Sequence, residues 1–94
     1  MIRIIAGSAK GRRILSLPEG SFVKPITGRM RQSAFDILRP KVPASRFLDL
    51  FAGVGSVGLE ALSRGAEAAF FVESDRKCIA VIEKNIERLG FAGK

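Results

Sequence analysis

The stretch Asp49-Leu50-Phe51-Ala52-Gly53-Val54-Gly55-Ser56-Val57-Gly58 joins the end of a strand to a glycine-rich turn, residues 52–58. Residues 47–51, which precede the turn, form a short and mostly apolar run, which is typical of a strand buried in a parallel sheet. Apolar positions after the turn predict a helix that stops at Gly65. A glycine-rich turn between a strand and a helix lets the backbone approach a ligand closely, and the helix start offers free N–H groups.

The alternation of strand and helix continues to residue 90. Residues 68–73 predict a second buried strand that ends at Glu73, and Asp75 can cap the helix that follows. The apolar stripe of that helix comprises Cys78, Ile79, Ile82, Ile86 and Leu89, and Gly90 ends it. Residues 46–90 therefore predict a βαβα unit. Two parallel strands are too few for a stable doubly wound sheet, so we expect a piece of a longer protein or a sheet that a partner completes.

The residues upstream of the turn predict a separate arm. Residues 2–6 and 12–17 read as a β-hairpin whose turn, 8–11, contains glycine. Thr27 is a good N-cap for a helix that runs to about Leu38. Apolar residues stand at helical spacing along it, at Met30, Ala34, Ile37 and Leu38. We therefore divide the chain into an arm, residues 1–45, and the first half of a cofactor-binding domain, residues 46–94.

The excess of positive charge lies entirely in the first half of the chain. The net charge is +7, and residues 1–46 hold ten basic and two acidic side chains, whereas residues 47–94 hold six basic and seven acidic ones. Lys10, Arg12 and Arg13 cluster at the tip of the predicted hairpin. This segregation favours a nucleic-acid-binding arm over charge that serves only general solubility.

Two carboxylates accompany the glycine-rich turn. Glu73 ends the second strand, where an acid can accept two hydrogen bonds from a ribose diol. The run from Gly53 to Gly58 also matches the dinucleotide fingerprint, so a domain that binds NAD is a serious alternative. Asp49, inside the first strand, argues against it, because a carboxylate there would repel a pyrophosphate but could hold the ammonium of a methionine moiety. The other alternative is a tight turn beside a surface carboxylate.

Composition excludes several classes of protein. The chain has no histidine, which excludes imidazole acid–base catalysis, a Ser-His-Asp triad and a histidine-bearing zinc site within it, and we expect no metal. Its single cysteine, Cys78, stands on an apolar helix stripe and is expected in the core rather than as a nucleophile. Apolar stretches are far shorter than the roughly 20 residues that span a bilayer, so we expect no membrane association and a cytoplasmic location.

These stretches together resemble the small-subunit rRNA guanine-N2-methyltransferases of the RsmD type, which are class I methyltransferases dependent on S-adenosylmethionine. The resemblance covers nearly the whole chain. It is carried by residues 4–7 with Lys10-Gly11-Arg12-Arg13, by residues 25–31 with 35–38, by residues 48–55, by Gly58-Leu59-Glu60-Ala61-Leu62-Ser63-Arg64-Gly65-Ala66, and by residues 71–73 with 75–76. Two residues depart from the family's pattern: Gly28 replaces an acid, and Asp36 replaces an asparagine. The resemblance implies an α/β fold of the Rossmann-like class, of which this chain holds the N-terminal part.

The resemblance also implies a set of residues that bind S-adenosylmethionine. Asp49, Gly53 and Gly55 would line its methionine part, Glu73 would hold the ribose hydroxyls, and Ser74 would lie beside the adenine. The remaining members are Phe51 and Ala52 in the turn, and Thr27, Arg29 and Arg31, which match a segment that packs over the cofactor in the family. An arginine of that segment could bind the donor's carboxylate. For Arg31 the alternative is a solvated helix face.

The resemblance assigns no catalytic residue to this chain. Methylases of exocyclic amines resemble one another in an Asp/Asn-Pro-Pro-aromatic motif, and none of Pro18, Pro25, Pro40 and Pro43 follows Asp or Asn. We expect the chain to supply the cofactor-binding half of an enzyme that methylates the N2 amine of a guanine in 16S rRNA of the small ribosomal subunit, monomeric when full length. The alternatives are a basic nucleic-acid-binding module without catalysis and the NAD-type domain.

Overall fold

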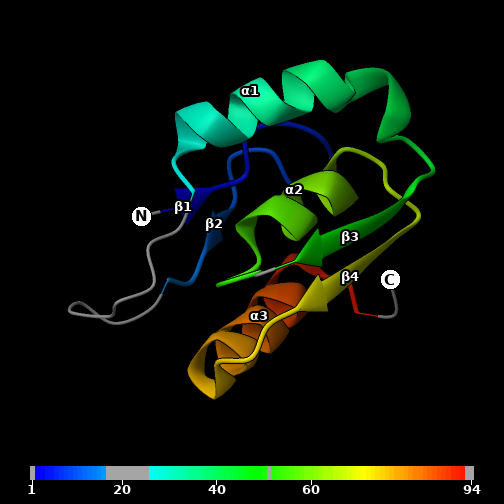
Figure 1. Cartoon of the computed structure of the whole chain (residues 1–94). Helices are drawn as coiled ribbons and strands as arrows, with labels where there is room; N and C mark the ends of the chain where they lie inside the picture. Colours follow the sequence, from blue (N-terminus) through cyan, green and yellow to red (C-terminus); the bar gives the residue numbers. More distant parts are fainter. Residues whose placement is uncertain (1, 17–25, 51, 93–94) are drawn as a thin grey trace.

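The computed structural model describes residues 2–16, 26–50 and 52–92 of the chain (Figure 1). Three helices and two small two-stranded sheets make up this part of the molecule. The elements in chain order are β1 (Ile2–Arg3), β2 (Arg13–Ile14), α1 (Gly28–Leu38), the 3-10 turn η1 (Arg39–Lys41), β3 (Arg46–Leu50), α2 (Ser56–Ser63), β4 (Ala68–Val72) and α3 (Arg76–Leu89).

The second half of the chain is the βαβα unit that the sequence predicts. β3 and β4 pair in parallel, in register from Arg46 opposite Ala68 to Leu50 opposite Val72. The caps of α3 are also confirmed. The Asp75 carboxylate accepts hydrogen bonds from the N–H groups of Lys77 and Cys78, and Gly90 ends the helix in the left-handed conformation.

The predicted burial of the two parallel strands is correct for one face only. The ring of Phe71 lies against Gly55 and Gly58, where a larger residue would place its side chain. Leu59 of α2 and Ile82 of α3 lie at the same place beside Gly55, so both helices cover the face of the sheet to which Phe71 points. Alternate residues point the other way, and four large apolar side chains there are exposed: Leu48, Leu50, Phe70 and Val72. Successive side chains of a strand point to opposite faces of the sheet, and the described residues cover only one of these faces, so buried and exposed side chains alternate.

The hairpin is confirmed but is shorter than the sequence predicts. β1 and β2 are antiparallel, with Ile2 opposite Ile14 and Arg3 opposite Arg13. Beyond the two-residue strands, Ile4 N–H still donates to the Arg12 carbonyl at 2.9 Å, and the N–H groups of Ile5 and Ala6 then donate to the side chain of Glu60, on α2.

Helix α1 begins as expected, but it buries a different face from the one that its apolar spacing marks. Thr27 caps it, since its hydroxyl accepts from the Met30 N–H at 3.2 Å. Met30 and Ile37 are nevertheless exposed, at 60% and 81%, and the buried side chains are Arg31 and Phe35. Phe35 packs on the Phe47 ring, so the aromatic contact with β3 decides which face of the helix turns inward.

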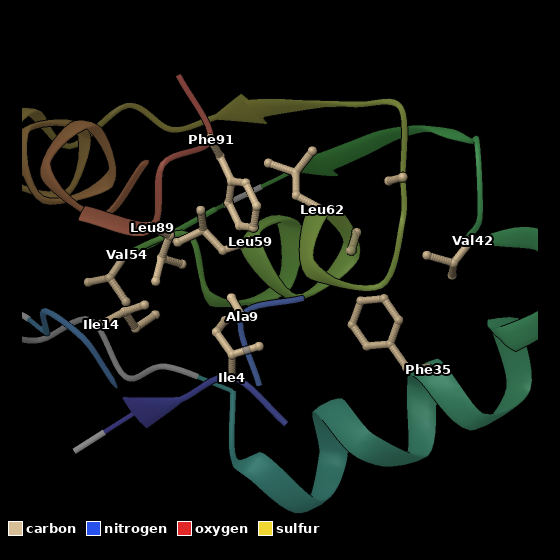
Figure 2. Packing of buried hydrophobic residues seen from close by; sticks show 12 residues of the cluster. Ile4, Ala9, Ile14, Phe35, Val42, Val54, Leu59, Leu62, Leu89 and Phe91 are labelled. Carbon is tan, nitrogen blue, oxygen red and sulfur yellow. The ribbon is translucent and has the colours of Figure 1, made fainter. Parts of the chain in front are cut away.

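One hydrophobic core joins the arm to the βαβα unit (Figure 2). Ile4, Ile14 and Phe35 from the first 45 residues point into the same interior as Leu59 and Leu62 of α2. The hairpin and α1 are therefore packed against the unit that carries the glycine-rich turn, and their positions relative to it are held by the core.

Candidate functional site

The glycine-rich turn leaves β3 and enters α2 through two residues with positive φ. Gly53 has φ 59° and Gly55 has φ 89°, conformations that side chains other than glycine rarely adopt. The turn is held by hydrogen bonds from Ala52 N–H to the Val72 carbonyl at 3.0 Å and from Gly55 N–H to the Ala52 carbonyl at 2.9 Å. Gly55 is the N-cap of α2 and offers it no side-chain acceptor. Phe51, which we expect in the same site, lies outside the described residues.

Glu73 is oriented toward this turn by two backbone groups. Its Oε1 accepts from the Gly53 N–H at 2.8 Å, and its Oε2 accepts from the Asp75 N–H at 3.0 Å. A carboxylate offers about four lone-pair positions, so two such bonds leave acceptors for a diol. The side chain is half-buried, and the neighbouring Ser74 is exposed.

Asp49 lies beneath the start of α2 and takes the place of the missing cap. It is 7% exposed, and its Oδ2 accepts from the Gly58 N–H at 3.0 Å. Burial raises the pKa of the Asp49 carboxyl, the bond from Gly58 opposes that rise, and the charge of Glu73 adds to it. The two carboxylates therefore concentrate negative charge at this edge of the sheet.

The two arginines of the segment before and within α1 differ sharply in environment. Arg29 is exposed, whereas Arg31 is 3% exposed, so the alternative of a solvated helix face is wrong for Arg31. Arg31 donates from Nη2 to the Arg3 carbonyl at 2.6 Å, and its Nε lies 3.5 Å from Glu60 Oε1. Its Nη1 is buried and has no hydrogen-bond partner within the described residues.

A hollow of about 480 Å³ lies beside the start of α1, between it and β1. Two polar residues of the predicted cofactor-covering segment belong to its wall, the exposed Thr27 and the buried Arg31. The full lining is Ile2, Arg3, Ile5, Ile26, Thr27, Gly28 and Arg31.

Glu60 is a structural residue that the sequence analysis did not single out. Its side chain is fully buried, and it accepts from Ile5 N–H at 2.9 Å, from Ala6 N–H at 3.0 Å and from Arg64 Nε at 2.8 Å. The available signal was an acid inside the apolar run of α2. This carboxylate connects Arg31 of α1, the N-terminal segment and α2 in one buried network.

Asn85 is a second such residue, and it connects the arm to the turn. It exchanges two hydrogen bonds with the backbone of Leu15, of 2.7 and 3.0 Å, and it donates to the Val54 carbonyl at 3.1 Å. Its signal in the sequence was its position among the apolar residues of the α3 stripe. The glycine-rich turn is therefore held from outside the βαβα unit as well as from within.

Known proteins share this arrangement over nearly the whole chain. The family described as Conserved hypothetical protein 95 matches residues 2–94. The chain belongs to this family. It is 42% identical over 88 residues to "Ribosomal RNA small subunit methyltransferase D" of Escherichia coli, and 41% identical over 88 residues to "Putative rRNA methyltransferase YlbH" of Bacillus subtilis. Each alignment covers 94% of this chain, and 44% and 47% of the respective relatives.

A solved structure titled "Putative methyltransferase yhhF from Escherichia coli" superposes with a TM-score of 0.85 at 40% identity, covering 98% of this chain and 48% of that one. The chain thus spans about half the length of these relatives. The resemblance to RsmD-type methyltransferases and the Rossmann-like α/β fold class are confirmed.

In this member of the Conserved hypothetical protein 95 family, the predicted nucleic-acid-binding residues all lie at the surface. Lys10, Arg12 and Arg13 are exposed, in the hairpin turn and at the start of β2. Of the three, Arg12 is the one whose side chain makes a hydrogen bond among the described residues, donating from Nη2 to the Arg88 carbonyl of α3 at 2.8 Å. The hairpin tip therefore touches the last turn of α3.

The described part of this family member shows neither a cluster of metal ligands nor a membrane-spanning helix. Residues 2–16, 26–50 and 52–92 contain no group of three or more His, Cys, Asp or Glu side chains placed to hold a metal ion. None of the described helices is long and apolar enough to cross a membrane. Cys78 is buried, as expected, and burial raises the pKa of its thiol, so it is a core residue rather than a nucleophile.

Proposed function

We propose that this chain is the S-adenosylmethionine-binding half of an enzyme that methylates the N2 amine of a guanine in small-subunit rRNA. The observation that carries the proposal is the pair of anchored carboxylates beside the glycine-rich turn. Gly58 N–H orients Asp49 from below, and Gly53 N–H orients Glu73 from the side. The names of the relatives, rRNA methyltransferases of two bacteria, supply the substrate class.

Each residue of the turn has a part in this proposal. Glu73 retains lone pairs for the two ribose hydroxyls, and Asp49 supplies negative charge for the ammonium group of the methionine moiety. Gly53 and Gly55 keep the backbone bare where the ligand would lie, and Ala52 and Ser74 are proposed as further cofactor-binding residues, as is Phe51 from its place in the sequence. When bound, S-adenosylmethionine would supply a methyl group on a sulfonium for in-line transfer to an amine, with the thioether sulfur of S-adenosylhomocysteine as the leaving group.

The segment at the start of α1 would complete the cofactor site. Thr27 and Arg31 line the hollow beside β1, and the buried Nη1 of Arg31 has no partner within the described residues. A carboxylate, such as the one that the methyl donor carries, would give that nitrogen a charged acceptor. The exposed Arg29 would act at the rim.

The division of labour follows the one expected from the sequence. Residues 46–94 would hold the donor, and residues 1–45 would cover it and bind rRNA through Lys10, Arg12 and Arg13. No residue of this chain is assigned to orient the amine. Transfer to a fixed amine depends chiefly on positioning, and the chain spans about half the length of the relatives it matches.

Isothermal titration calorimetry of the chain with S-adenosylmethionine tests the cofactor assignment. Glu73→Gln should weaken binding at least about tenfold, because each hydrogen bond to a charged acceptor contributes about 1.5–3 kcal/mol. Glu67→Gln is the matched control, since it removes the same charge from an exposed position before β4. Binding of NAD in place of S-adenosylmethionine would establish the dinucleotide alternative. Binding of RNA with no response to either cofactor would establish the non-catalytic basic module.

A further inference from the structure

Helix α3 carries three cations along one exposed flank, whereas its other exposed flank holds two acids together with Arg76. At 3.6 residues per turn, Lys77, Lys84 and Arg88 fall within an arc of about 40°, and the centre of the flank with Glu83 and Glu87 lies about 100° from the centre of that arc. All five side chains are exposed. The buried stripe of the helix, with Cys78, Ile82, Asn85 and Leu89, separates the two flanks on the inner side.

This arrangement is unfavourable for the helix itself. Lys84 and Arg88 are like charges four residues apart, and so are Glu83 and Glu87; each such pair destabilises a helix by about 0.2–0.5 kcal/mol, and the opposite-charge pair Lys84 and Glu87, three residues apart, offsets about one of them. Interspersed signs would have stabilised it by a similar amount. The ion pairs found among the described residues involve none of these five side chains. Solubility does not require such segregation, so the three cations are available to a partner.

The hairpin is in direct contact with one end of the basic flank. Arg12 Nη2 donates to the carbonyl of Arg88 at 2.8 Å. That carbonyl belongs to the last turn of α3, where helical carbonyls lack partners and the helix dipole is negative. The Arg12 guanidinium offsets this negative end, which would otherwise repel an anion that approaches Arg88. Arg12 of the hairpin and Arg88 of α3 are therefore neighbours in space.

We propose that Lys77, Lys84 and Arg88 form a phosphate-binding surface on α3 that continues the basic hairpin. From residue 77 to residue 88 the helix rises about 16 Å, enough to follow several phosphates of an RNA backbone. The surface binds phosphates without reading bases, so it orients the RNA relative to the cofactor site. This inference rests on the proposed rRNA-binding function and adds to it a second element, remote in sequence from the arm.

The test is binding of a fluorescently labelled RNA hairpin to the chain, followed by anisotropy between 50 and 200 mM salt. The Lys84→Gln, Arg88→Gln double variant should bind more weakly, and the slope of log affinity against log salt should fall by about 0.7–0.9 per lost contact. The matched control is the Lys41→Gln, Arg76→Gln double variant, which removes the same charge from η1 and from the opposite flank of α3. Its affinity and slope should stay close to those of the unmodified chain.

Thermal unfolding of the same variants separates binding from folding. Lys84→Gln, Arg88→Gln removes one like-charge pair, but also the favourable Lys84–Glu87 pair and a cation at the negative end of the helix, so its Tm should stay within a few degrees of that of the unmodified chain. Unchanged RNA affinity in this variant, with weakened binding by Lys10→Gln, Arg13→Gln, would overturn the α3 surface and leave the RNA-binding arm intact. Equal weakening by the control variant would reduce the effect to net charge and also overturn it. No binding of RNA by the unmodified chain would refute the proposed rRNA-binding function itself.

Discussion

Replacing Glu60 by glutamine removes the one negative charge from the buried network beneath the N-terminal segment. In the native chain this carboxylate receives the N–H groups of Ile5 and Ala6, and it is the counter-charge of Arg31 and Arg64. Glutamine has nearly the same shape and keeps one acceptor oxygen. The substitution therefore isolates the loss of charge from the loss of packing.

The loss in free energy of unfolding caused by Glu60→Gln follows from the burial of Arg31. Breaking a buried ion pair by removing one partner costs about 3–5 kcal/mol, since the other charge stays buried without compensation. Burial already lowers the pKa of Arg31, and Glu60 is the group that opposes this effect. Arg64, at 12% exposure, lies close enough to the surface to recover part of its hydration. A chain of 94 residues has a total stability of about 5–14 kcal/mol, so Glu60→Gln should remove a large share of it.

The assay is urea unfolding followed by far-UV circular dichroism, because the chain has no tryptophan or tyrosine to report by fluorescence. Glu67→Gln, at an exposed site, should change the free energy of unfolding by no more than about 0.5 kcal/mol. Adding Arg31→Met to Glu60→Gln should restore part of the loss, because it removes the orphaned charge. A loss below about 1 kcal/mol in Glu60→Gln, or strict additivity with Arg31→Met, would refute the reasoning.

Two further substitutions test the turn and the packing of the N-terminal segment. Asp49→Asn should raise Tm near pH 7 and weaken S-adenosylmethionine binding in calorimetry. Burial raises the pKa of Asp49, so its ionised form opposes folding above the ordinary aspartate pKa of about 3.9. The gain in Tm should therefore vanish toward about pH 4. A lower Tm for Asp49→Asn than for the unmodified chain at about pH 7 would contradict this reasoning. Gly7→Ala should unfold the chain at lower urea than Gly11→Ala, although both glycines have positive φ, because a Cβ at Gly7 would lie 1.8 Å from the Ser63 carbonyl oxygen and one at Gly11 meets nothing within 4 Å. Equal urea midpoints for these two variants would show that the close approach to Ser63 has no energetic consequence.

Much of the fold could be predicted because its signals are local. The caps Thr27, Asp75 and Gly90 act on backbone groups within a few residues, so their chemistry marks the helix ends in the sequence itself. Gly53 and Gly55 mark the turn because the left-handed backbone there favours glycine. Two carboxylates at the ends of neighbouring parallel strands must meet at one edge, which is why Asp49 and Glu73 could be paired in advance.

Glu60 and Asn85, which join the parts of the molecule, are marked in the sequence only as polar residues among apolar ones, and nothing local identifies their partners. Glu60 bonds to backbone groups 54 and 55 residues away, and Asn85 to a residue 70 positions away. Neither partner contributes a recognisable side chain, because the contacts are made to peptide N–H and C=O groups that every sequence position possesses.

The sequence by itself determined the order of strands and helices, the bare glycine-rich turn and the carboxylates beside it, because local periodicity and backbone conformation specify them. Only the tertiary structure decided which charges are buried. Arg31 and Arg29 are two residues apart in one helix, yet one is enclosed against Glu60 and the other is exposed. The cause is packing from elsewhere in the chain: the ring of Phe35 on Phe47 of β3 rotates α1 so that Arg31 turns inward, and burial depends on what covers a side chain rather than on its neighbours in sequence.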